Sequence, residues 1–222
     1  KALYELSNLD RVIGGVNEQS SRFAMSLFRE LTVGRCIQTD SKTAEFVKLA
    51  ENSFRDVNIA FANELRDMCV AKSVEFTDVQ KLANKHPRVQ ILQAGIGVGG
   101  HCIPVDPWFL LSSSRSEEAV ASVIRSARDI NDRQPELVAT EIKEFCKKNK
   151  INDIMILGLT YKADVNDFRG SPASKIVQFL SKSGDLAISV CDPFLKSDHT
   201  IISFGEVKVE DIDSISEKEL YV

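Results

Sequence analysis

The sequence lacks the features that mark several large classes of protein. No apolar run approaches the length of a membrane span, no secretory signal is visible, and no repeat or low-complexity segment occurs. The 222 residues carry a net charge of -4, which gives no electrostatic reason to expect nucleic acid or an anionic membrane as a partner. The length predicts one large or two small domains, and the content of 43% hydrophobic and 27% charged residues is ordinary for a soluble globular protein.

Cysteine and histidine are too scattered to suggest a metal centre or a disulfide framework. The 5 cysteines include no CxxC pair and are odd in number, so we expect free thiols, no metal and a reducing, cytoplasmic setting. Only 3 histidines occur. His101 precedes Cys102, but adjacent side chains usually point apart, and we find no acyl-transfer triad in the sequence.

The N-terminal part is typical of the end of an α/β domain. KALYELSNL looks helical, and RVIGGV (11–16) and CIQT (36–39) look like strands on either side of a helix from Glu18 to Leu31. The apolar residues of that helix recur at helical spacing: Phe23, Leu27, Phe28 and Leu31. The chain opens without methionine and stops at ELYV, which resembles the start of a strand, so we expect both ends to be cut.

A long helix is predicted next. Asp40 and Ser41 can cap a helix that begins near Thr43, and its apolar residues continue at helical spacing to Val70 without glycine or proline. Such a length is unusual in a globular domain and suggests a spine between domains or subunits. The apolar residues that carry the pattern are Phe46, Leu49, Ala50, Phe54, Val57, Phe61 and Leu65.

Three further helices are expected before residue 149. One lies around 78–83, one runs from Glu117 to Asn131, and Pro135 starts another that ends near Lys148. In the second of these we expect an inward apolar face with two arginines beside it, consisting of Val120, Val123, Ile124 and Ala127 with Arg125 and Arg128.

From Ile151 the pattern is that of a second α/β domain. DIMILGL (153–159) and LAISVCD (186–192) are typical of buried parallel strands, and Ser171-Pro172 is a good helix start between them. We expect that helix to turn its apolar residues inward, namely Ile176, Val177 and Leu180. The connection TYKADVNDFRG follows a parallel strand, where open α/β sheets bind ligands, and it offers Lys162 and Arg169.

The stretch GIGVGGHCIPVDP (95–107) is the most distinctive in the chain. Its glycines, which include Gly95, Gly97 and Gly99, let backbone N–H groups approach a ligand closely. Two prolines stiffen its exit and rule out a helix through the segment. Cys102 therefore sits on a rigid loop with Asp106 four residues on. The alternative is a glycine turn beside an inert cysteine, because free cysteine is usually buried.

This stretch also matches the dinucleotide fingerprint G-x-G-x-x-G, with VQIL (89–92) as a candidate preceding strand. The fingerprint needs a helix that opens at its third glycine and faces the pyrophosphate. HCIPVDP follows here and cannot form that helix. We therefore reject a Rossmann phosphate loop at this position.

A polar stripe runs down the predicted long helix. Lys48, Asn52 and Arg55 share one face with Ile59, at spacings of four, three and four residues. The stripe is either a solvated face or a set of donors for an anion or a developing oxyanion. His86 and Arg88, just before the glycine loop, are likewise either surface groups or ligand contacts.

Three segments together closely resemble the nucleotide-sugar 6-dehydrogenase family. They are AEFVKLAENSFRDVNIAFANEL (44–65), NKHPRVQILQAGIGVGGHCIPVDPWF (84–109) and LGLTYKADVNDFRGSPA (157–173). The resemblance implies an α/β protein in three parts: residues 1–40 as the end of an N-terminal NAD-binding, Rossmann-like domain, 41–148 as a helical central domain that forms a homodimer, and 149–222 as a partial, Rossmann-like UDP-binding domain. The NAD fingerprint of the first part has no counterpart in the sequence.

The resemblance also implies residue roles. Cys102 is the expected nucleophile, Lys48 and Asn52 polarise the reacting oxygen, and Asp106 positions water. The residues expected to bind the UDP-sugar are Arg55, His86, Arg88, Gly95, Gly97, Gly99, Tyr161 and Lys162, with Arg88 reaching across from a neighbouring subunit. Arg169 is expected to reach the cofactor NAD.

The neighbouring residues NSFRDVN and HPRV favour the branch of the family that carries out the four-electron oxidation of UDP-N-acetyl-D-mannosamine to the uronate. UDP-glucose, or another UDP-hexose, is the alternative substrate, because the UDP-glucose enzymes of this family share the spacings Lys48/Asn52 and Cys102/Asp106. A second hypothesis is a binding and dimerisation fragment, so the chain as given is expected to bind UDP-sugar without reducing NAD. A third is a structural α/β protein with an inert cysteine.

Overall fold

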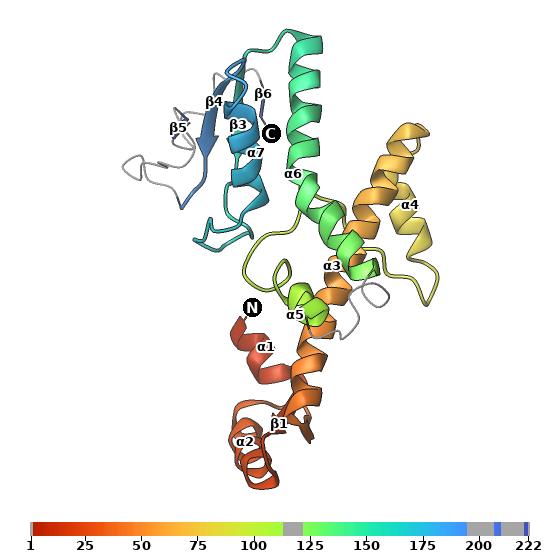
Figure 1. The fold of residues 1–222 in the computed structure, drawn as a ribbon, viewed down its shortest axis with the longest axis vertical. Coiled ribbons are helices and arrows are strands. Elements are labelled where there is room, and N and C mark those ends of the chain that lie inside the picture. Colours follow the sequence, from red (N-terminus) through yellow and green to blue (C-terminus); the bar gives the residue numbers. More distant parts are fainter. Residues whose placement is uncertain (1, 113–121, 195–206, 210–219, 222) are drawn as a thin grey trace.

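The computed structural model describes residues 2–112, 122–194, 207–209 and 220–221. Figure 1 shows an elongated arrangement, with a small α/β unit at one end, two long helices that cross in the middle, and a second sheet at the other end. Within the described residues, no helix is both long and apolar enough to cross a membrane.

The N-terminal unit consists of α1 (Ala2–Asn8), β1 (Arg11–Gly15), α2 (Glu18–Leu31) and β2 (Cys36–Asp40). The two strands pair in parallel, and Asn17 caps α2 by accepting a 2.8 Å hydrogen bond from the backbone N–H of Ser20. The predicted β-α-β order is confirmed. The apolar face of α2 is largely uncovered, because Phe23 and Leu27 are 74% and 52% exposed.

The predicted spine helix is α3 (Ser41–Ala71), and Asp40 caps it through the backbone N–H of Thr43. The helix turns small and polar side chains toward its neighbours: Asn52, Ser53, Asp56, Ala60, Ala62 and Asn63 are buried. Phe46, Phe54 and Phe61 are half or more exposed. Helical spacing therefore predicted the helix correctly, but the apolar residues do not form its buried face.

Two short helices follow, α4 (Phe76–Ala83) and α5 (Asp106–Ser112). The prediction that prolines exclude a helix from the end of the glycine stretch is wrong from Asp106 onward. Pro107 lies in the first turn of α5, where a missing N–H costs no hydrogen bond within the helix.

The helices predicted on either side of Pro135 form one continuous helix in the described residues, α6 (Ser122–Asn149). Proline inside a helix bends it without always ending it, and Figure 1 shows α6 bent between two straight parts. The predicted positions 117–121, with Val120, lie outside the described residues. Ala127 is buried as expected, but Val123 is 65% exposed and Arg128 only 1% exposed, so the assignment of the inward face was wrong at these two residues.

The C-terminal unit is a parallel sheet of order β5-β4-β3-β6. Its elements are β3 (Asp153–Leu157), α7 (Pro172–Ser181), β4 (Ala187–Cys191), β5 (Lys208–Val209) and β6 (Leu220–Tyr221). Ser171 caps α7, and Ile176, Val177 and Leu180 are buried as predicted. They form one apolar core with β3, β4 and the C-terminal half of α6.

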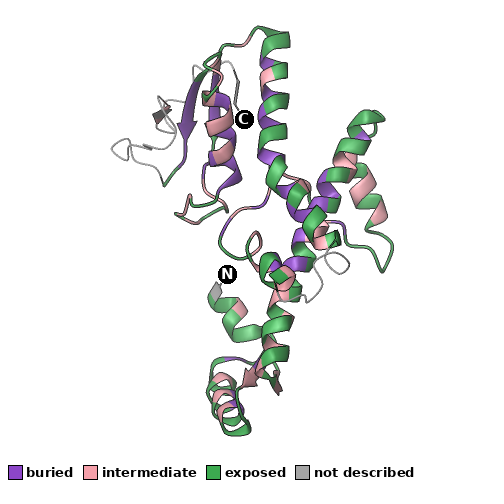
Figure 2. Ribbon diagram, viewed as in Figure 1, coloured by how far each residue is buried: buried purple, intermediate pink, exposed green. Residues whose placement is uncertain are grey.

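Burial is concentrated in two regions, as Figure 2 shows: the C-terminal sheet with α7, and the crossing of α3 and α6. The first region is apolar. The second contains Asp56, Asn63, Arg128 and Asn131, each at most 1% exposed. The bend of α6 joins the two regions, and the glycine stretch lies at this junction, since Gly97 is close to Asn131 and Pro135 of α6.

Candidate active site

The glycine stretch is a loop between α4 and α5, and VQIL before it forms no strand. Gly97 has a φ of +122°, which favours glycine, and a Cβ there would lie 3.2 Å from both the carbonyl oxygen of Asn131 and Cδ of Pro135. Because Pro135 has no N–H, the carbonyl of Asn131 has no helical partner at that position. The loop backbone therefore lies against the bend of α6.

The next two glycines bring the loop against the C-terminal unit. A Cβ on Gly99 would lie 2.6 Å from Cδ of Pro172, and one on Gly100 would lie 2.8 Å from the ring of Tyr161. The close approach that these glycines permit is thus an approach of two protein segments. The expectation that Gly95, Gly97 and Gly99 line a sugar remains a proposal.

All cysteines lie in the described residues, and among them Cys102 alone is exposed. Its carbonyl accepts hydrogen bonds from the backbone N–H groups of Val105 (3.0 Å) and Asp106 (2.8 Å), in the turn that leads into α5. Cys69, Cys146 and Cys191 are buried, and Cys36 is half-buried. The alternative of a buried, inert cysteine at position 102 therefore does not hold.

The spine helix meets this turn directly. The amide nitrogen Nδ2 of Asn52 donates to Oδ2 of Asp106 over 2.5 Å. Lys48 lies one turn earlier on the same face of α3, is exposed, and has its Nζ atom 3.7 Å from a carboxylate oxygen of Glu51. The structure thus brings Asn52 and Asp106 together and places Cys102 and Lys48 within a turn of them along the chain.

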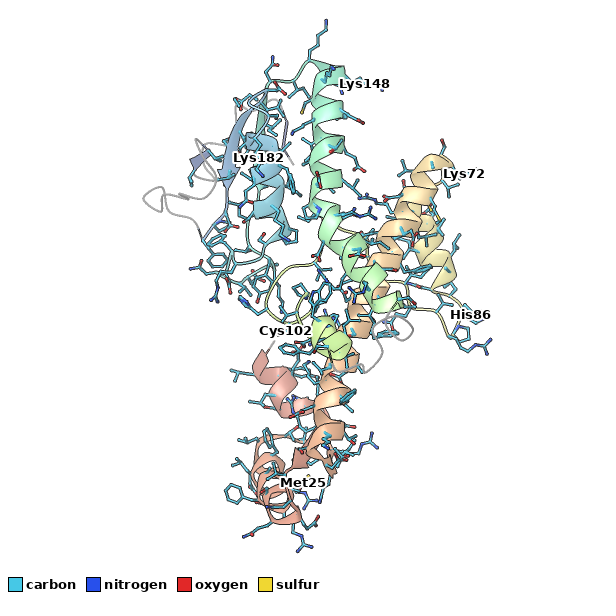
Figure 3. All side chains as sticks on the ribbon, in the orientation of Figure 1. Met25, Lys72, His86, Cys102, Lys148 and Lys182 are labelled. Atoms are coloured by element: carbon cyan, nitrogen blue, oxygen red, sulfur yellow. The ribbon has the colours of Figure 1, made fainter. Side chains whose placement is uncertain are left out.

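Two residues predicted to bind the UDP-sugar, His86 and Arg88, lie away from Cys102 in this chain. His86 and Arg88 follow α4, and Nδ1 of His86 accepts a 3.3 Å hydrogen bond from the backbone N–H of Arg88. Both residues line an open groove of about 1010 Å³ with Phe54 and Phe61 of α3, and Cys102 does not line this groove. Figure 3 shows His86 and Cys102 in separate parts of the molecule. Arg55, on α3, is exposed.

The connection between β3 and α7 carries the remaining predicted residues and lies beside Cys102. Oδ2 of Asp167 is 3.0 Å from Nε2 of His101 and 2.9 Å from Nη2 of Arg169, whose Nε is 3.0 Å from Oδ1. The ring of Tyr161 meets that of His101 edge-on. Lys162 is exposed. The hydrogen bonds from Arg169 and then His101 hold the pKa of Asp167 well below its usual value.

Sequence reasoning missed two groups of residues here. Asp167 was read as part of a loop, although it joins His101 to Arg169. The buried polar residues Asp56, Asn63 and Asn131 were also missed, together with the burial of Arg128. Helical spacing could have indicated Asp56 and Asn63, because both residues continue the face of α3 that starts at Lys48 and Asn52. No group of three or more metal-ligating side chains occurs among the described residues.

Comparison with known proteins gives two matching family models. Residues 42–133 match the central domain of the UDP-glucose/GDP-mannose dehydrogenase family, and residues 155–219 match the UDP binding domain of the same family. Together these segments cover most of the chain.

Individual relatives agree with these matches. The chain is 44% identical over 196 residues to UDP-N-acetyl-D-mannosamine dehydrogenase of Campylobacter jejuni, which covers 88% of this chain and 47% of the relative. It is 45% identical over 194 residues to NDP-N-acetyl-D-galactosaminuronic acid dehydrogenase of Ralstonia nicotianae, covering 87% of this chain and 45% of the relative.

A solved structure, the UDP-D-ManNAc dehydrogenase from Pyrococcus horikoshii, superposes with a TM-score of 0.80 at 38% identity, over 94% of this chain and 52% of that one. The chain therefore spans about half the length of the relatives that it matches. Its order of elements, its loop with an exposed cysteine and both domain matches lead to one conclusion: this chain belongs to the UDP-glucose/GDP-mannose dehydrogenase family.

Proposed function

We propose that the natural polypeptide that carries this chain oxidises UDP-N-acetyl-D-mannosamine at C6 to the uronate, with Cys102 as the nucleophile. The observation that carries the proposal is the exposed thiol of Cys102 in the turn that leads to Asp106, which Asn52 of the spine helix contacts. The names of two relatives, in Campylobacter jejuni and Pyrococcus horikoshii, favour this substrate.

Four electrons must leave C6 in two steps. When bound, NAD supplies the hydride acceptor for both steps. Cys102 adds its sulfur to the aldehyde that the first oxidation leaves, and the resulting thiohemiacetal carries the hydrogen that leaves in the second. The product is a thioester on Cys102. Water cleaves the thioester, which returns the thiol and releases the carboxylate.

The other residues act on protons and charge. Lys48 takes up the proton of the C6 hydroxyl and, with the amide of Asn52, polarises the reacting oxygen. Asp106 orients the attacking water, and its contact with Asn52 holds the carboxylate in place. Lys162 and Tyr161, together with the backbone at Gly95, Gly97 and Gly99, bind the UDP-sugar.

Arg169 is the residue of this chain that we assign to NAD. Its side chain is 77% exposed beside the turn that carries Cys102, so its position fits an anionic dinucleotide. The guanidinium already pairs with Asp167, which fixes its orientation before any ligand arrives.

We further propose a homodimer in which Arg55, His86 and Arg88 of one subunit complete the site of the other. Two observations support this. Phe54 and Phe61, at 66% and 50% exposed, form an apolar face of α3 that adjoins the groove with His86 and Arg88. That groove does not contain Cys102. Sedimentation of the natural polypeptide and its Phe54→Asp variant tests the interface, and an unchanged dimer in the variant contradicts it.

The activity is tested by supplying the natural polypeptide with NAD and one sugar nucleotide at a time. UDP-N-acetyl-D-mannosamine is expected to yield two NADH per uronate, with a kcat/KM well above those for UDP-glucose and UDP-N-acetyl-D-galactosamine. Cys102→Ser is expected to release no uronate. The matched control is Cys36→Ser, at a half-buried cysteine on β2. A higher kcat/KM for UDP-glucose would falsify the substrate assignment.

A further inference from the structure

The buried polar residues at the crossing of α3 and α6 form one connected chain of contacts. Nη1 of Arg128 lies 2.5 Å from Oδ1 of Asp56, and Nη2 pairs with Asp132. Nδ2 of Asn131 donates to the same carboxylate oxygen of Asp56 and to its backbone carbonyl, both at 2.9 Å. Oδ1 of Asn131 accepts from Nδ2 of Asn63 at 3.4 Å.

This chain ends on the glycine loop. Oδ1 of Asn63 accepts a 2.8 Å hydrogen bond from the backbone N–H of Gly95. The side chain of Asn63 is fully buried and uses one end of its amide for the loop and the other for α6. A side chain held at both ends has a fixed orientation, and it transmits that orientation to the backbone that it binds.

The same helix holds the other end of the loop. Asn52 and Asn63 lie eleven residues apart on one face of α3, about 16 Å along the helix axis. Asn52 binds Asp106, where the loop passes into α5, and Asn63 binds Gly95, where the glycine run begins. Cys102 lies between these two attachments. The length of a rigid helix thus fixes the separation of the loop ends.

A packed apolar contact could join α3 to α6 without such residues, and burying an ion pair is costly because both charges lose water. An amide, in contrast to an apolar side chain, can bind the N–H of Gly95 in a directed way. The loop also meets the crossing of α3 and α6 at Gly97, which lies beside the carbonyl of Asn131 and the ring of Pro135.

We propose that Asn63, oriented by the buried Asp56–Arg128–Asn131 contacts, is a positioning residue that sets the conformation of residues 95–106 and thereby the placement of the Cys102 sulfur. Asn63 touches neither the sulfur nor any reacting atom. The effect on catalysis rests on the proposed function, whereas the effect on the loop does not.

The test compares Asn63→Ala in the natural polypeptide with Ala62→Gly, a change at the neighbouring, equally buried position of α3. Variants at Asp56 or Arg128 are avoided because each leaves an unpaired buried charge and risks unfolding. Asn131→Leu is the second variant, since it removes the support of Asn63 and leaves the side chain of Asn63 itself intact. Thermal unfolding establishes that all three variants are folded.

Hydrogen–deuterium exchange of the peptide that covers residues 95–106 is the first measurement. Asn63→Ala is expected to speed exchange in this peptide about tenfold or more, and Asn131→Leu is expected to speed it less. Ala62→Gly is expected to leave exchange unchanged, when each variant is measured at the same interval below its own unfolding temperature. Equal exchange in Asn63→Ala and Ala62→Gly overturns the proposal, whether or not the protein proves to be a dehydrogenase.

Steady-state kinetics is the second measurement. Because a misplaced nucleophile costs about 10²-fold in rate, Asn63→Ala is expected to lower kcat by about that factor with KM changed less than about threefold. A loss that appears in KM alone, or an equal loss in Ala62→Gly, overturns the positioning role. An absence of any dehydrogenase activity in the unmodified protein refutes the proposed function, and the exchange result then decides the positioning role of Asn63 on its own.

Discussion

The amide of Asn52 donates to the carboxylate of Asp106 across 54 residues of sequence. Asn52 is 3% exposed and Asp106 is half-buried, and their contact holds the first residue of α5 against the spine helix. Cys102 is fixed to the same turn, because its carbonyl accepts the backbone N–H of Asp106. This part-buried contact therefore links the turn that carries Cys102, the carboxylate of Asp106 and the helix that carries Lys48.

Replacing Asn52 tests the value of that contact. Asn52→Ala leaves the carboxylate of Asp106 without this donor, which we expect to lower the free energy of unfolding by about 1–3 kcal/mol. Loss of a donor to the reacting oxygen is expected to lower kcat by about 10²-fold. Denaturant titration and steady-state NADH formation measure the two effects. Asn149→Ala, at an exposed asparagine that ends α6, is the control, and equal losses in both variants contradict the role of Asn52.

Lys48 should matter for rate and hardly for stability. Its side chain is 63% exposed and its ion pair with Glu51 is a surface pair, worth at most about 1 kcal/mol. As an acid/base group it contributes about 10²–10⁴-fold to kcat. We therefore expect Lys48→Ala to unfold almost as the unmodified protein does and to lose at least about 10² in kcat. Lys42→Ala, at another exposed lysine of α3, serves as the comparison, and activity close to normal in Lys48→Ala refutes the assignment.

Gly99 should not tolerate a side chain. A Cβ there would lie 2.6 Å from Pro172 and 2.8 Å from the carbonyl oxygen of Gly170, so loop and C-terminal unit must separate. We expect Gly99→Ala to cost about 1–3 kcal/mol of stability. The matched variant for stability is Gly95→Ala, whose Cβ meets nothing within 4 Å. Urea titration of both variants checks this, and equal midpoints argue against the packing described here.

The Asp167 carboxylate should contribute a stability that depends on pH. Hydrogen bonds from Arg169 and His101 lower its pKa in the folded state, so the contribution is present above the unfolded value of about 4 and is lost as the pH falls below it. We expect Asp167→Asn to unfold at a lower temperature than the unmodified protein at pH 7, with the gap shrinking toward pH 3. A gap that stays constant over this range shows that the charge of Asp167 is not its source.

Much of the secondary structure could be predicted because local signals determine it. Asp40 and Ser171 cap the helices that they were expected to start, and α2 has the bounds that its apolar spacing predicts. Ile154, Met155 and Ile156 of β3 and the apolar face of α7 are buried as their patterns predict, whereas Leu157 at the end of β3 is exposed. Local rules failed at Pro135, since a proline reads equally well as the start of a helix or as a bend within one, and only packing at the bend decides between them.

The site could be predicted only as a set of residue types. Spacing places Lys48 and Asn52 on one face of a helix and Cys102 near Asp106, but a pattern contains no distance between Asn52 and Asp106. The charge of Arg128 predicts an exposed side chain, but the residue is buried as an ion pair with Asp56. Because Asp56 lies 72 residues away in the chain, no local pattern indicates this pairing. The buried side chains of α3 are small or polar, so a search for apolar faces selected the exposed phenylalanines in their place.

The central claim is that the sulfur of Cys102 becomes covalently attached to the oxidised sugar. The most direct measurement is the mass of the peptide that carries Cys102, after the Asp106→Asn variant of the natural polypeptide is mixed with UDP-N-acetyl-D-mannosamine and NAD and quenched in acid. Loss of the water-orienting carboxylate should let the thioester accumulate, so we predict a peptide heavier by the UDP-sugar acyl group and sensitive to hydroxylamine. An unmodified Cys102 peptide in a variant that still forms NADH from this substrate would contradict the account.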